Sequence, residues 1–118
     1  MALRFSFPFD GGEVAVLLKH ITYAEKLDSS SKLYLVNGDV LEVNVPIAMI
    51  ERSLLRHGFV RIHERYVINT ELIQLYIPAR TDRVVLAGGK QLLVGKQRKS
   101  GLLRFMRSRE SMSELSIA

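Results

Sequence analysis

The sequence is divided by glycine-containing turns into short runs of apolar and β-branched residues. Asn37-Gly38 lies between "KLYLV" and "DVLEV", and such a pair is typical of a two-residue type I′ turn, in which both central residues have positive φ. Gly88-Gly89 lies in the same way between "RVVLA" and "KQLLV". These patterns predict two β-hairpins and favour a fold made of many short strands.

Further strands are expected over residues 3–9, 13–18 and 21–26, with "DGG" as the turn between the first two. A first helix is expected to begin at Pro46, because proline suits a first helical position. Gly58 is expected to end it, and a second helix is expected from about 97 to 107. The fold class is therefore mainly β, with small antiparallel sheets and two short helices.

The chain has 118 residues and no cysteine, which fits one domain without disulfides or thiolate metal ligands. Its longest apolar run, "VAVLL", is far shorter than the ~20 residues of a membrane-spanning helix, and the N-terminus lacks the pattern of a signal peptide. We expect a cytoplasmic protein with one domain over residues 1–107 and a flexible, serine-rich tail over 108–118.

Positive charge is concentrated in the second half of the chain. Residues 60–118 hold eleven Lys/Arg and five Asp/Glu, a balance of +6, whereas residues 1–59 hold six and seven, a balance of −1. Such a block attracts nucleic acid, an acidic membrane surface or an acidic partner, although a solvated basic face would look the same.

The sequence offers little to a catalytic mechanism. The three histidines show no metal-ligand spacing, and His63-Glu64 falls in a predicted strand, where neighbouring side chains point to opposite faces. The glycines of "AGGKQ" are better explained by a hairpin than by a phosphate-binding loop. We expect no enzymatic activity, no cofactor and no metal.

Residues 58–69, "GFVRIHERYVIN", form the densest polar segment. A single regular strand there would mix polar and apolar residues on both faces, so we predict a break or bulge near Glu64-Arg65 and a new apolar segment from Tyr66. The break would bring His63 and Arg65 close to a loop. Asn69 is either a polar group offered to a ligand or a turn or helix cap, with Glu71 or Leu72 in the first turn.

This segment and its surroundings resemble the LytTR family of bacterial DNA-binding domains. The family signature runs Phe-x-Arg-Ile/Val-His-Arg/Lys-Ser-Tyr-Ile/Val-Val-Asn, which "FVRIHERYVIN" largely matches. Upstream, "HITYAEK" resembles the strand that the family writes as "dIlYIEa", and the helix before the signature and the glycine-containing turn after it come in the same order. The resemblance covers roughly residues 13–107.

The resemblance implies an elongated, LytTR-like fold that docks loops, instead of a recognition helix, into successive major grooves of double-stranded DNA. It implies a transcriptional regulator and a second copy on paired direct repeats. A receiver domain or membrane segment would not fit ahead of a domain that begins within the first ~20 residues, so we expect control by abundance, self-association, a small ligand or a regulatory protein partner.

The resemblance also implies which residues contact DNA. Base contacts are implied for Ser31 in the 26–32 loop, for Asn69 and for Lys96, since asparagine can pair with adenine and lysine can donate to guanine. Structural roles for Arg61, His63 and Asn69, and a merely solvated Lys96, remain alternatives. Phosphate contacts are implied for Lys32, Arg98 and Lys99, and the other candidate DNA-binding residues are Lys26, Arg61, His63 and Arg65.

Four positions depart from the family pattern. Glu64 stands where the family usually has arginine or lysine, Arg65 where it has serine, Gly95 where it has serine, and Lys96 where it more often has arginine. Glu64, Gly95 and the small "DSSS" loop motivate an alternative function: a protein-interaction module that pairs with a related regulator and titrates it without reading DNA. Non-specific nucleic-acid binding is a third possibility.

Overall fold

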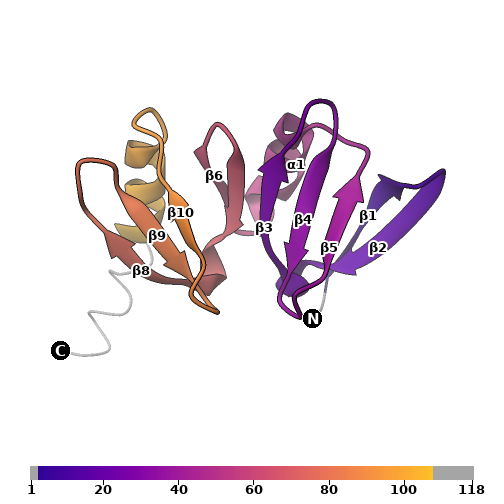
Figure 1. Ribbon diagram of the computed structural model, residues 1–118, viewed down its shortest axis with the longest axis horizontal. Helices are drawn as coiled ribbons and strands as arrows, with labels where there is room; N and C mark the ends of the chain where they lie inside the picture. The colour runs from indigo at the N-terminus through magenta and orange to yellow at the C-terminus, as the bar shows by residue number, and fades with distance from the viewer. Residues whose placement is uncertain (1–2, 108–118) are drawn as a thin grey trace.

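Three antiparallel sheets and two helices make up the computed structural model, which describes residues 3–107 (Figure 1). The mainly β architecture expected from the sequence is confirmed. The predicted flexible tail, residues 108–118, lies outside the described residues. The strands are β1 (Arg4–Phe9), β2 (Gly12–Leu17), β3 (Ile21–Lys26), β4 (Ser31–Leu35), β5 (Val40–Val43), β6 (Phe59–His63), β7 (Tyr66–Asn69), β8 (Ile73–Ile77), β9 (Arg83–Leu86) and β10 (Gln91–Leu93).

The strands pair as a β1–β2 ribbon, a five-stranded sheet in the order β5-β4-β3-β7-β6, and a three-stranded sheet in the order β10-β9-β8. Helix α1 (Ile47–Leu54) joins β5 to β6, and a second helix covers residues 99–107. Three short 3-10 turns, Leu18–His20, Leu55–His57 and Thr70–Leu72, link neighbouring elements. In Figure 1 the β6–β7 hairpin lies between the β1–β5 half and the β8–β10 half of the molecule.

The β6–β7 hairpin is buried on both faces. Phe59 and Val67 belong to one hydrophobic cluster, which includes α1 residues and the β1–β2 ribbon. Val60, Ile62 and Ile68 belong to a second cluster, which includes β9, β10 and Leu102 of the second helix. The mixed pattern of residues 58–69 therefore arises because each face of the hairpin packs against a different core.

The break predicted near Glu64-Arg65 is confirmed, and it is the turn of this hairpin, with His63 paired to Tyr66. The register shifts between Arg61 and His63. In the shifted segment the Ile62 carbonyl accepts a 2.7 Å hydrogen bond from the Gly95 amide, which joins the five-stranded sheet to the segment that precedes the second helix.

The type I′ turn predicted at Asn37-Gly38 is wrong. Asn37 does not have positive φ, and the loop contains three residues, closed by hydrogen bonds from Gly38 N to Leu35 O (3.0 Å) and from Leu35 N to Asp39 O (2.9 Å). The Asn37 side chain accepts from the Asp39 amide, which favours this longer loop. A two-residue turn with both φ values positive occurs instead at Asp10 (46°) and Gly11 (79°), between β1 and β2.

Helix α1 places Ile47, Ile50 and Leu54, which share one helix face through their i, i+3, i+7 spacing, in the first core. Pro46 precedes the helix as its cap, with extended backbone (ψ 154°), and is therefore not the first helical residue. After the 3-10 turn over Leu55–His57, Gly58 ends the helical segment with φ of 84°.

We expect Gly58→Ala to lower the free energy of unfolding by about 1 kcal/mol, because a β-carbon makes the left-handed conformation unfavourable. Gly101→Ala is the matched control. Gly101 lies inside the second helix without a positive φ and with open space where a β-carbon would lie, so alanine there should stabilise by roughly 0.5–1 kcal/mol. Urea denaturation measures the free energy of unfolding of both variants. An equal effect of the two substitutions would contradict the left-handed conformation of Gly58.

Candidate nucleic-acid interface

Four connecting segments lie along one edge of the molecule, the upper edge in Figure 1. They are the β3–β4 loop (27–30), the β6–β7 turn (64–65), the β8–β9 loop (78–82) and the segment 94–98 before the second helix. We call this the loop edge. It collects residues from distant parts of the sequence because antiparallel pairing returns alternate strand ends to the same side.

Shallow depressions follow one another along the loop edge. The first is lined by Lys26, Leu27, Asp28, Glu64 and Arg65. The next shares Glu64 with it and adds residues of the 94–98 segment, and a third reaches the β8–β9 loop. The last two share His63, Gly95 and Lys96, so the depressions form one continuous, largely basic surface.

Several cations of the loop edge are paired with carboxylates. Lys26 lies 3.4 Å from Glu64, and Arg65 lies 3.7 Å from Glu25. Lys26, Arg65 and Glu64 remain substantially exposed, so each ion pair contributes little to stability and leaves the cation accessible. Glu25 also accepts a 2.7 Å hydrogen bond from Tyr34, and burial together with this carboxylate raises the pKa of Tyr34 to about 12.

Lys96 differs from these cations. It is exposed at the start of the turn that leads into the second helix, and no ion pair engages it within residues 3–107. Gly95 beside it would place a β-carbon 3.5 Å from His63 Cα, an ordinary contact distance. The position therefore has room for a β-carbon.

Arg61 is a structural residue of the loop edge. Its side chain is only 9% exposed and donates to the backbone carbonyls of His63 and Glu64 at the β6–β7 turn. It also pairs with Glu51 of α1 at 3.0 Å, and the other oxygen of Glu51 pairs with Arg98 at 3.0 Å. Glu51 thus ties the hairpin turn to the segment before the second helix, and Arg98 keeps a 41% exposed side chain at the edge.

His63 is half-buried and helps to shape the β6–β7 turn. Its Nδ1 accepts a 3.1 Å hydrogen bond from the Arg65 amide, and its ring lies 5.4 Å from that of Tyr66. The ring also lines two of the depressions, so His63 combines a structural role with a place on the surface.

Asn69 lies away from the loop edge, at the other end of β7, and is 4% exposed. Its Nδ2 donates to the Ile21 carbonyl at 3.0 Å, and its Oδ1 accepts from the Glu71 amide at 3.1 Å as the cap of a 3-10 turn. The interior of the protein engages both ends of the amide. Asn69 is therefore the cap of this 3-10 turn, as one of the two expectations for it had it, and its amide is held inside the protein.

Ser31 is also interior. It is fully buried, and its hydroxyl donates to the Val45 carbonyl at 2.8 Å. The exposed tip of the same loop is Asp28-Ser29, three and two positions before the implied contact at Ser31. Lys32 is half-buried on β4, opposite Glu25 and Glu42 of the neighbouring strands, which places it behind the tip.

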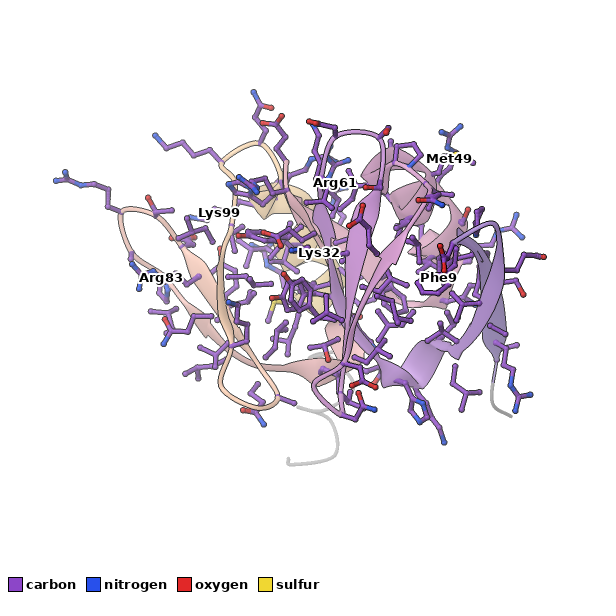
Figure 2. The ribbon with its side chains drawn as sticks, turned by 45° about the vertical axis from the view of Figure 1, so that its right-hand side comes forward. Phe9, Lys32, Met49, Arg61, Arg83 and Lys99 are labelled. Carbon is purple, nitrogen blue, oxygen red and sulfur yellow. The ribbon has the colours of Figure 1, made fainter. Side chains whose placement is uncertain are left out.

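Arg80 is a surface residue that the sequence did not single out. It lies in the β8–β9 loop, is exposed, and lines the same depression as Lys96 and Lys99. The signature residues gave no indication of it, although an arginine two positions after Pro78 is a recognisable exposed loop residue. In Figure 2, Lys99 and Arg83 lie on the half of the molecule opposite Phe9 and Met49.

Lys99 pairs at 2.9 Å with Asp82, whose side chain is 5% exposed. Asp82 also accepts from the Tyr76 hydroxyl at 2.5 Å and from the Ala79 amide at 2.9 Å. The Tyr76 hydroxyl, the Ala79 amide and Lys99 together hold the pKa of Asp82 well below its ordinary range. Lys99 therefore faces a carboxylate whose charged form is favoured by all three of these partners.

The family model for the LytTr DNA-binding domain matches residues 12–107. A solved structure has the same fold, with a TM-score of 0.75, 16% identity, and coverage of 87% of this chain and 95% of the other. It is the LytTr DNA-binding domain of a protein described as a putative methyl-accepting/DNA response regulator from Bacillus cereus. No curated protein sequence matches the chain.

The chain belongs to the LytTR family of DNA-binding domains, as its signature indicated. The family is one of DNA-binding domains and not of enzymes. Across residues 3–107, neither helix has the length and apolar character needed to cross a membrane. The same residues contain no cluster of three or more potential metal ligands.

We expect Asn69→Ala to lower the free energy of unfolding by about 2–3 kcal/mol, because it removes a cap and leaves the Ile21 carbonyl without this donor. Asn44→Ala is a matched control at an exposed position. Urea denaturation gives the two values. An Asn69→Ala protein that keeps its stability but loses discrimination between DNA sequences would instead support base contacts by Asn69.

Proposed function

We propose that the protein is a sequence-specific transcriptional regulator that lays its loop edge along double-stranded DNA and inserts edge loops into successive major grooves. The observation that carries this proposal is the continuous basic surface formed by loops from four parts of the chain. Its cations come from β3, the β6–β7 turn, the β8–β9 loop and the 94–99 segment.

The dimensions of the molecule support docking along the duplex. The longest axis measures 51 Å, and the loop edge runs along it in Figure 1. Successive major grooves on one side of B-DNA are about 34–36 Å apart. The molecule is therefore longer than the spacing of successive major grooves, which supports docking of separate edge loops into two grooves.

The exposed residues divide into two roles. Lys96 and the neighbouring Gln97 lie in a turn outside the strands and the helix, so they are placed to donate to base edges in a major groove. Ser29 at the β3–β4 tip is the corresponding short polar group at the other loop. Phosphate contacts, which set the register of the protein on DNA, fall to Lys26, Arg65, Arg98 and Lys99.

Two copies of the protein on paired direct repeats would extend the contact with DNA. Because its proposed target is chromosomal DNA, we expect the protein to act in the bacterial cytoplasm. Arg61, Ser31 and Asn69 act through the fold, because their polar groups are engaged inside the protein. Lys32 contributes to the local positive potential from behind the loop tip.

The test is selection of a random duplex DNA pool on the purified protein at near-physiological salt, followed by sequencing. We expect enrichment of a short motif, repeated where two copies bind. Protein that stays folded but enriches nothing would contradict sequence-specific binding and favour the partner-titrating module, for which capture of a related regulator is the next measurement.

Glu64→Gln should raise the affinity for DNA of unrelated sequence several-fold, since it removes an exposed carboxylate beside the phosphates and releases Lys26. Folding stability should change by less than about 1 kcal/mol, because the ion pair is exposed. Fluorescence anisotropy with a non-specific duplex measures the affinity. An unchanged affinity would place Glu64 away from the DNA backbone.

A further inference from the structure

The depression between the β8–β9 loop and the 94–99 segment brings Arg80, which has no role so far, beside Lys96 and Lys99, which are already proposed to contact DNA. Its volume is about 240 Å³, and Arg80, Lys96 and Lys99 line it with the hydroxyl-bearing Thr81 and the ring of His63. It lies at the end of the loop edge farthest from the β3–β4 loop (Figure 1).

Its charges are unbalanced. Three cations, Arg80, Lys96 and Lys99, face one carboxylate, that of Asp82, so the depression has a formal net charge of +2. Asp82 is already engaged by Lys99, Tyr76 and Ala79. No ion pair holds Arg80 or Lys96 in the part of the chain that the structure describes, so both are available to an anion.

The β8–β9 loop is held in place. The Asp82 carboxylate accepts from the Ala79 amide and the Tyr76 hydroxyl, and the Asp82 carbonyl accepts a 2.8 Å hydrogen bond from the Val94 amide. These bonds fix the loop at both of its ends against β8 and the residue after β10. Arg80 is therefore presented on an ordered loop, which lowers the entropic cost of binding.

We propose that this depression binds a backbone phosphate of DNA, with Arg80 as its main ligand, so that the β8–β9 loop is a further DNA-contacting segment. The proposal rests on the proposed function and extends it beyond the residues of the family signature. The planar, two-pronged guanidinium of Arg80 suits phosphate oxygens, and Lys96 and Lys99 add charge from the opposite wall.

The experiment measures affinity for the selected duplex at several salt concentrations, for the wild-type protein, Arg80→Ala and Lys90→Ala. Lys90 is exposed in the turn at the opposite edge, so its substitution removes one positive charge without touching the depression. We expect Arg80→Ala to reduce the slope of log K against log salt by about 0.9 and to weaken binding about fivefold at 0.15 M salt, the counterion-release contribution of one phosphate contact.

Lys90→Ala should leave the slope and the affinity close to wild type. Equal effects of Arg80→Ala and Lys90→Ala would overturn the proposal, because the net charge of the protein would then explain the loss of affinity. No effect of either substitution would also overturn it, because Arg80 would then make no phosphate contact. Wild-type protein that binds no DNA would instead overturn the proposed function itself. Thermal unfolding of each variant verifies that the fold is retained.

A free phosphate would use the same chemistry, so a second arm separates the two sources. Thermal unfolding is followed in inorganic phosphate and in chloride at matched ionic strength. We expect inorganic phosphate to shift the unfolding temperature by the same amount in the wild-type protein and in Arg80→Ala. Stabilisation by phosphate that only the wild type shows, with an unchanged salt slope for DNA, would assign the depression to a free phosphorylated ligand and overturn the DNA assignment.

Discussion

The burial of the β6–β7 hairpin on both faces is the constraint on which the rest of the structure depends. One face completes the core that includes α1 and the β1–β2 ribbon, and the other completes the core beneath the three-stranded sheet and the second helix. A chain of this size could not easily sustain two independent cores. Sharing one hairpin lets two small clusters support each other, and it fixes how the two halves are oriented.

The same hairpin organises the loop edge, the surface proposed to meet DNA. Its turn lies at the centre of the loop edge, and three contacts reach outward from it. The Arg65 carbonyl accepts from the Lys26 amide at 2.8 Å, the Ile62 carbonyl accepts from Gly95, and Arg61 joins Glu51, which in turn holds Arg98. The end of β3 and the 94–98 segment are thus fastened to one element, the hairpin, and such support gives loops the precision that base recognition requires.

Local signals explain what the sequence could predict. Glycines at turns, alternating apolar runs and the spacing of Ile47, Ile50 and Leu54 identify strands and α1, and the mixed polarity around Glu64 identifies the hairpin break. The LytTR signature identifies the family. Asn69 could not be placed in the same way, because its burial depends on the Ile21 carbonyl, 48 positions away. Arg80 joins Lys96 only through sheet pairing, which no local pattern encodes.

The carboxylates of the loop edge have a consequence for how DNA binding responds to salt. Lys26, Arg65, Arg98 and Lys99 each lie beside a carboxylate of the protein itself, so a phosphate that meets one of them displaces an internal partner and not only a dissolved anion. Such an exchange releases fewer ions to solution than the contact of a bare cation. If these residues contact phosphates as proposed, the salt dependence of DNA binding gives fewer protein–phosphate contacts than the protein makes.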